Sequence, residues 1–308
     1  FKPQGAELWT RDAPDFPGFY DTIRAQRDVV FDVSVRNVKL PSGQSKDFSY
    51  RVITFDADLV AATLPTYHVG DLWWNEAEPG WGISISQGAS GQLFGTWYTY
   101  RADGSAQWAV MSGGTWETPT RFTGTLYTTT GTPYDRLPFV SGQTAVTAAG
   151  SLTLEFSDAS HGTMRYTLNG QSNTKAITRQ PFSRGAETIT DGRNFTGLWN
   201  DPAESGHGIS LNMQYRTLFG VAYVYDQAGK SAWFTLPGCT WANETDCSGP
   251  IYTVTGPGGA VGGTFDPAQV RVTAAGSASV HFVDDYNATL TYTLNGFTAT
   301  KTIKRYEF

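Results

Sequence analysis

The stretch "DLWWNEAEPGWGISIS" (71–86) recurs in the same chain as "GLWNDPAESGHGISLN" (197–212), and this repetition decides the fold. Further along, "YTYRADGSAQW" (98–108) returns as "YVYDQAGKSAW" (223–233). The offset between the copies is 126 positions for the first pair and 125 for the second, so they align almost without gaps. We therefore expect two modules of one fold. A residue kept in both copies is a candidate for an architectural role, because a unique active site seldom needs duplication.

Each copy is a series of short segments rich in Thr, Tyr and Val, separated by turns that combine Gly with Asn, Asp or Ser. Such segments predict antiparallel strands joined in sequence by tight turns. Eight or nine strands favour closure into an up-and-down barrel, which removes the exposed edges. A two-sheet β-sandwich is the alternative. We expect an all-β chain of two tandem antiparallel meander β-barrels with these parts: an N-terminal extension (1–68), a first β module (69–182), a linker (183–194) and a second β module (195–308).

The N-terminal extension belongs to neither copy. Apolar and polar residues alternate in segments 29–40 and 48–59, which predicts a hairpin of two half-buried strands. The Pro-rich stretch before it predicts at most one short helix, at 18–27. A two-stranded hairpin is marginal alone, so it packs on a module, completes a neighbour's sheet or ends a larger domain. We predict that this segment mediates self-association.

The composition excludes several classes of partner. The formal net charge is −6 and no basic block occurs, which argues against a nucleic-acid or anionic-membrane partner. The sequence contains no run of 18 apolar residues, so it predicts no membrane span. The opening "FKPQGAELW" lacks the apolar core of a signal peptide, so an exported protein would be a processed form.

Known catalytic and metal patterns are also missing from the sequence. None of the four histidines occupies a position shared by the copies, and no metal-ligand spacing appears. No G-x-S-x-G motif or recognisable triad order occurs. We predict no metal, no cofactor and no enzymatic activity.

The two cysteines, Cys239 and Cys247, are eight positions apart in the second copy. Their aligned positions in the first copy hold Gly114 and Phe122, so the pair is an addition and not a requirement of the fold. The separation suits a small disulfide loop across a hairpin. A disulfide indicates an oxidising compartment.

Trp73 and Trp199 lie on the predicted first strands, and Arg179 and Arg305 lie on the predicted last strands. This pairing resembles that of small meander barrels such as lipocalins and avidins, where an early Trp covers the barrel floor and a late Arg packs over it. A guanidinium can stack on indole and donate to strand-end carbonyls. We expect a structural role for all four residues.

Glu78 and Glu204 are also shared by the copies, in "EPGWG" and "ESGHG". Glycosidase chemistry needs two carboxylates in distinct environments, and neither module offers an obvious second one. We expect both to be structural, accepting hydrogen bonds from backbone amides or from a last-strand Arg or Lys.

The tryptophans read as unshared are candidates for contact with a ligand or partner, because exposed Trp stacks on sugar rings and anchors interfaces. They are Trp74, Trp81, Trp97, Trp116 and Trp241.

The repeat W-W-x-x-x-E-x-G-W-G, Y-T-x-N-G and K-x-I-x-R-x-x-F resembles a tandem β module found in the C-terminal parts of exported proteobacterial proteins. The resemblance covers residues 70–308 and carries no activity; it implies export and an accessory role. We expect a secreted or cell-surface structural or adhesive protein that self-assembles. The alternatives are a polysaccharide-binding accessory module and the C-terminal part of a larger exported hydrolase. The expected partners are the protein itself or an extracellular glycan.

Overall fold

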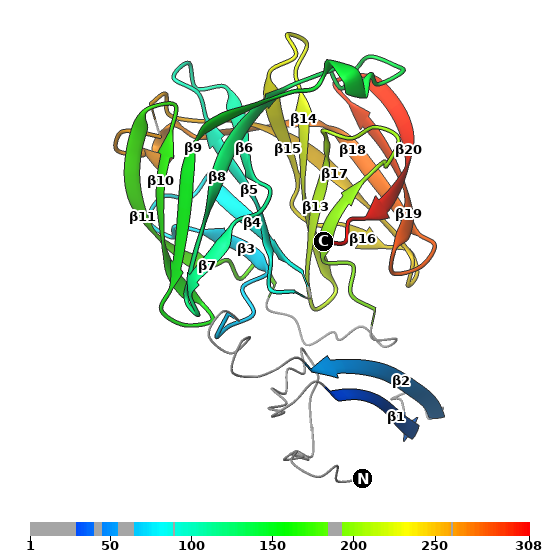
Figure 1. Cartoon of the computed structure of the whole chain (residues 1–308). Helices are drawn as coiled ribbons and strands as arrows, with labels where there is room; N and C mark the ends of the chain where they lie inside the picture. Colours follow the sequence, from blue (N-terminus) through cyan, green and yellow to red (C-terminus); the bar gives the residue numbers. More distant parts are fainter. Residues whose placement is uncertain (1–28, 40–44, 55–64, 89, 184–192, 260) are drawn as a thin grey trace. The chain divides into compact units, whose positions relative to one another are not determined.

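The structure is a computed structural model of the whole chain (Figure 1). It describes residues 29–39, 45–54, 65–88, 90–183, 193–259 and 261–308, the first two ranges by their backbone alone. The chain divides into two compact units, Phe1–Leu64 and Pro65–Phe308, and each is described by itself. The short helix predicted at 18–27 lies outside the described residues.

In the first unit, strands β1 (Val29–Lys39) and β2 (Ser45–Thr54) pair antiparallel as a two-stranded sheet. This confirms the predicted hairpin, with the second strand beginning earlier than expected. The register shifts between Val35 and Val38, as at a β-bulge.

The first repeat folds into a closed barrel of eight antiparallel strands, barrel 1. Pairing of Arg179 with Trp73 joins the last strand to the first, and pairing of Val110 with Tyr127 completes the ring. The ring consists of β3 (Asp71–Trp74), β4 (Gly82–Gln87), β5 (Leu93–Tyr100), β6 (Ala106–Met111), β8 (Arg121–Thr130), β9 (Ala145–Phe156), β10 (His161–Leu168) and β11 (Gln171–Arg179). The short β7 (Thr115–Thr118) pairs with β8 outside the ring.

The second repeat has the same strand order and forms barrel 2 (Figure 1). Its ring consists of β12 (Gly197–Asn200), β13 (Gly208–Gln214), β14 (Thr217–Tyr225), β15 (Ser231–Leu236), β17 (Asp246–Thr255), β18 (Arg271–Phe282), β19 (Asn287–Leu294) and β20 (Phe297–Arg305). The short β16 (Thr240–Trp241) pairs with β17. The tandem barrels are as the sequence predicts, and the sandwich alternative is wrong.

Each barrel has one long strand that continues through a glycine. In barrel 1, β9 runs from Ala145 through Gly150 to Phe156. Gly150 adopts a φ of +151°, and a Cβ at this position would collide with the carbonyl oxygen of Thr167. A β-bulge next to it lets the strand bend and continue. Gly276 does the same in barrel 2.

The loop after β8 (residues 131–144) leaves barrel 1 and covers the mouth of barrel 2. The Gly131 N–H donates to the Gly229 carbonyl of barrel 2 at 3.0 Å. Phe139 then meets the ring of His207 edge-on, with the centroids 4.2 Å apart. We call residues 131–144 the lid loop.

Barrel 2 makes the equivalent contact with barrel 1 through the loop after β17 (residues 256–270). The Gly256 N–H donates to the Gly104 carbonyl of barrel 1 at 3.0 Å. Phe265, the equivalent of Phe139, packs on Tyr100 at 6.2 Å. The two barrels therefore exchange equivalent loops about an approximate two-fold relation.

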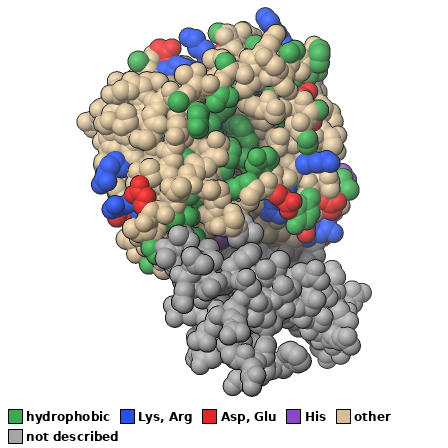
Figure 2. Space-filling view, in the orientation of Figure 1, with side chains coloured by type: hydrophobic (Ala, Val, Ile, Leu, Met, Phe, Trp, Pro, Cys, Tyr) green, Lys and Arg blue, Asp and Glu red, His purple; other side chains and the backbone are tan. Residues whose placement is uncertain are grey.

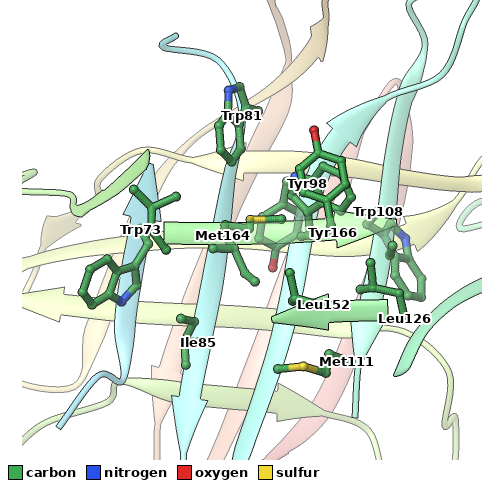
Figure 3. Close-up of a cluster of buried hydrophobic side chains, with 14 of the residues drawn as sticks. Trp73, Trp81, Ile85, Tyr98, Trp108, Met111, Leu126, Leu152, Met164 and Tyr166 are labelled. Carbon is green, nitrogen blue, oxygen red and sulfur yellow. The ribbon is translucent and has the colours of Figure 1, made fainter. Parts of the chain in front are cut away.

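The largest buried cluster spans both barrels. It joins the interior of barrel 1 (Figure 3) to Tyr223, Tyr225 and Trp233 of barrel 2. In the face drawn in Figure 2, hydrophobic side chains gather in the middle, and charged side chains of both signs lie around the sides. The two modules therefore share a buried core.

None of the described residues forms a helix long and apolar enough to cross a membrane. The described residues also contain no group of three His, Cys, Asp or Glu side chains placed to hold a metal ion.

Candidate functional site

A cavity of about 90 Å³ lies inside barrel 2. Its floor includes Trp199, and its wall is mostly aliphatic and aromatic. The inward-facing residues of the strands supply that wall, among them Ile209, Ala222, Phe234, Ile251, Leu290 and Ile303. A concave, mostly apolar chamber with a few polar groups is the usual form of a small-molecule site.

The cavity exists because barrel 2 carries smaller side chains where barrel 1 is filled. Trp97 and Trp81 are 2% and 7% exposed in barrel 1. Their aligned positions in barrel 2 hold Ala222 and His207, and both line the cavity. In barrel 1, therefore, two indole rings fill the space that is empty in barrel 2.

One difference between the barrels makes the cavity in barrel 2 smaller. Ala222 pairs across the strands with Phe234, whereas in barrel 1 the same two positions are Trp97 and Ala109. Phe234 therefore takes up part of the lost volume from the neighbouring strand. The exchange leaves less aromatic volume in barrel 2, because a phenyl ring replaces an indole.

The lid loop of barrel 1 closes the mouth of this chamber. Tyr134 meets Phe234 edge-on at 5.5 Å, and the amide of Asn295 donates to the Tyr134 hydroxyl at 2.9 Å. Leu137 lines the cavity and is 57% exposed, so it lies where the cavity meets solvent. Barrel 1 therefore contributes residues to the site in barrel 2.

Lys301, Glu204 and His207 form a polar cluster at the mouth, and Arg136 and Asp201 also line the cavity. Lys301 Nζ donates to both carboxylate oxygens of Glu204, at 2.6 Å each. His207 Nε2 lies 3.3 Å from Glu204 Oε2, but the atoms are not aligned for a hydrogen bond and Nε2 is buried without a partner among the described residues. The ion pair is internally compensated, whereas the imidazole still has hydrogen-bonding capacity.

Barrel 1 shows the same cluster in a saturated form. Lys175 donates to Glu78 Oε1 at 2.7 Å, and Trp81 Nε1 donates to Oε2 at 3.0 Å. The expectation that Glu78 and Glu204 accept from a last-strand Lys is confirmed in both barrels. The exchange of Trp81 for His207 is what leaves a polar atom unpaired in barrel 2.

Burial lowers the pKa of His207 to about 4, and the positive charge of Lys301 acts in the same direction. Desolvation disfavours the charged imidazolium, so the ring is neutral near pH 7. In a neutral imidazole one nitrogen donates and the other accepts a hydrogen bond. The mouth therefore offers a ligand an uncharged hydrogen-bonding group.

The floor of each barrel is the expected Trp–Arg pair. The Arg179 guanidinium carbon lies 5.2 Å from the ring centre of Trp73, and that of Arg305 lies 6.0 Å from Trp199. Both guanidinium groups also donate to backbone carbonyls just before the first strand. The predicted packing of a late Arg over an early Trp is therefore present in both barrels.

The prediction that unshared tryptophans contact a partner is wrong for Trp81 and Trp97, because both are buried in barrel 1. A large side chain without a counterpart fills space here instead of reaching out. Trp74 is half-buried, and its indole nitrogen is enclosed.

Trp116 and Trp241 are wrongly read as unshared, since they occupy equivalent places on β7 and β16. Trp116 Nε1 donates to the Gly91 carbonyl at 2.7 Å, and Trp241 Nε1 donates to the Arg216 carbonyl at 2.6 Å. Both are half-buried. This repeated hydrogen bond indicates an architectural role for the pair.

Sequence reasoning also missed Ala222, Tyr292 and the lid loop as parts of a site. The signal was present at Ala222, where an alanine replaces a tryptophan between otherwise similar strands. The role of the lid loop could not be predicted, because its sequence does not show which barrel it covers.

Cys239 and Cys247 form the predicted disulfide, with the Cα atoms 5.6 Å apart. In barrel 1 the Cys247 position is Phe122, a fully buried ring that packs on Trp116 at 5.2 Å. The disulfide therefore replaces a hydrophobic contact near β16. It is compatible with an extracellular protein.

Comparison of the chain with protein-family models, with curated proteins and with solved structures gave no match.

Proposed function

We propose that this protein is a non-enzymatic binding protein that holds a small, largely apolar molecule inside barrel 2. The observation that carries the proposal is the contrast between equivalent interiors, one filled by Trp81 and Trp97 and the other hollow at His207 and Ala222. A core that lacks side-chain volume costs free energy, by roughly 24 cal/mol for each Å³ of cavity. A ligand that fills the cavity would offset this free-energy cost.

The two barrels have different tasks under this proposal. Barrel 1 is solid and supplies the lid loop, whereas barrel 2 supplies the chamber and the polar groups at its mouth. The lining holds two positive side chains, Lys301 and Arg136, and two negative ones, Glu204 and Asp201. Because Lys301 and Glu204 are paired and His207 is neutral, the chamber has no net charge, which favours an uncharged ligand.

Methyl NMR titration with benzene and with cyclohexane tests the proposal site by site. Leu236, Ile251 and Leu290 report on barrel 2. Their equivalents in barrel 1, Met111, Leu126 and Met164, provide the matched control. We expect the barrel 2 methyl signals to shift in a saturable manner while the barrel 1 signals stay in place. Unchanged signals in both barrels at millimolar probe would refute the proposal.

A second candidate function is self-assembly through the N-terminal segment. It is supported by β1 and β2, which form a sheet of two strands with no further strand paired to either among the described residues. Addition of a strand to such a sheet is a common mode of association. Light scattering of the intact chain and of a chain beginning at residue 65 separates the possibilities: assembly predicts a size difference beyond the deleted mass.

The glycan-binding alternative loses its best contact residues, because Trp81 and Trp97 are inside barrel 1. An accessory role behind a larger exported hydrolase is compatible with the binding proposal, and export is compatible with the disulfide.

A further inference from the structure

The repeat provides a template for what the cavity binds. In barrel 1 the indole of Trp97 packs against Tyr166, with ring centroids 4.4 Å apart and planes inclined at 48°. Tyr292 is the equivalent of Tyr166 and lines the cavity of barrel 2. The tyrosine is thus kept in both barrels, and its aromatic neighbour is kept in one.

The face of Tyr292 toward the cavity has no ring against it among the described residues. The one ring that Tyr292 contacts among the described residues is Phe297, with the centroids 6.5 Å apart, and Phe297 does not line the cavity. Aromatic pairs are worth about 0.5–1.5 kcal/mol beyond the area they bury. A planar ring at the place of the missing indole would restore that contact.

The volume decides how large this ring is. An engineered apolar cavity of about 150 Å³ accepts benzene. The cavity in barrel 2, at about 90 Å³, is smaller, partly because Phe234 projects from the neighbouring strand. Because it is smaller than the cavity that accepts benzene, a single ring enters when the lid loop moves outward, and a fused pair of rings is too large.

The polar side chains at the mouth of the cavity indicate which polar group the ligand carries. His207 Nε2 is buried and lacks a hydrogen-bond partner among the described residues, and Lys301 and Glu204 adjoin it. A hydroxyl group both donates and accepts, so it pairs with this nitrogen in either tautomer of the ring. An unpaired buried polar atom is costly, which favours a ligand that satisfies it.

We propose that barrel 2 binds a single-ring aromatic molecule carrying one hydroxyl group, with its ring against Tyr292 and its hydroxyl at His207. The proposal rests on the proposed function and names its ligand class.

Calorimetric titration of the full chain with phenol, benzene and cyclohexanol tests this assignment. Phenol and cyclohexanol share the hydroxyl, and phenol and benzene share the flat ring. We expect phenol to bind with roughly threefold to tenfold higher affinity than either of the others, because each lacks one of the two contacts. Cyclohexanol binding as tightly as phenol overturns the aromatic assignment and leaves the proposed function standing. If none of the three binds, both fall.

Three variants locate the site. Ala222→Trp places the indole of barrel 1 in the cavity and should abolish phenol binding. Tyr292→Leu keeps an apolar wall, so it should weaken phenol binding and leave cyclohexanol binding nearly unchanged. Trp97→Ala opens the matching space in barrel 1 against Tyr166, so a second and weaker phenol site should appear there, because Trp81 stands at the place of His207 and is already bonded to Glu78.

Phenol binding that persists at full strength in both Ala222→Trp and Tyr292→Leu would overturn the location. If Ala222→Trp does not fold, Ala222→Leu narrows the same space and should also reduce phenol affinity. Circular dichroism of each variant establishes folding before titration.

Discussion

Trp108 and Trp233 occupy equivalent positions in the two barrels, and each donates its indole N–H to a backbone carbonyl of the other barrel. Trp108 Nε1 lies 2.9 Å from the Val224 carbonyl oxygen, and Trp233 Nε1 lies 3.0 Å from that of Thr99. The acceptors are themselves equivalent residues. This reciprocity is the pattern of an isologous two-fold interface, here built within a single chain.

We expect Trp108→Phe and Trp233→Phe to destabilise the protein by similar amounts, each by about 1–3 kcal/mol. The phenyl ring keeps much of the packing but leaves a buried carbonyl without its donor. Denaturant unfolding measures the change. Val272→Thr, at a position 61% exposed, serves as the control and should have little effect. A difference of several kcal/mol between the two Phe variants would contradict the symmetric interface.

We expect residues 65–182 alone not to give a stable monomer. Without barrel 2, the first module lacks the loop of residues 256–270, from which Val261 and Phe265 enter its core. Its own lid loop is free to cover a second copy, so the outcome should be a dimer or an unfolded chain. Light scattering and circular dichroism decide, and a cooperatively folded monomer would show that the barrels are independent.

Trp199→Ala should destabilise by about 3–5 kcal/mol, the usual cost of truncating a buried Trp. The repeat alone predicts that Trp81→Ala does far less, because His207 replaces it in the sister copy. The structure changes that expectation: Trp81 is 7% exposed and donates to Glu78, so its removal should cost a comparable amount. Urea midpoints of the two variants provide the comparison, and a shift confined to Trp199→Ala would restore the first expectation.

Stability should fall on acidification because His207 must remain neutral in the folded chain. Its folded pKa of about 4 is below the ordinary 6.5, so the unfolded chain binds the proton first. The contribution is complete above pH 6.5, declines as the pH falls toward 4 and is constant below that. It amounts to roughly 3 kcal/mol, since one pKa unit corresponds to about 1.4 kcal/mol.

The matched control for this pH effect is His207→Trp, which installs the residue of the sister copy. Lys301, Glu204 and Asp201 are the other charged groups around His207, and they are unchanged in the variant. The difference in melting temperature between the wild type and the variant should widen between pH 6.5 and 4. Parallel pH curves would show that His207 does not carry the effect.

Replacing Cys239 and Cys247 by Ser should lower stability by about 2–3 kcal/mol, the chain-entropy value for so short a loop. The fold should persist, because barrel 1 is built without a disulfide at Gly114 and Phe122. Thiol labelling of the native wild type should detect no free cysteine. Loss of the β-sheet spectrum in the double variant would mean that barrel 2 depends on the bond.

The strand pattern and the repeat are sufficient to predict both barrels and several of the contacts within each. Strand segments, turns and the offset between copies predict two closed meanders, since alternation and turn chemistry act locally. The Trp199–Arg305 floor, the pairing of Glu204 with a last-strand Lys and the disulfide were also predictable, because each recurs in both copies or sits at a suitable spacing.

The way in which the two copies meet, and the position of the cavity, depend on contacts that form when the chain has folded. The lid loop, with Phe139, covers the other barrel, and no local pattern reveals this because it depends on contacts between distant segments. Trp97 faces inward, whereas the repeat alone left it free to be a surface residue. A cavity is the difference between the volume of a barrel and that of all side chains inside it. That difference at Ala222 and His207 becomes visible when the whole ring of strands has closed.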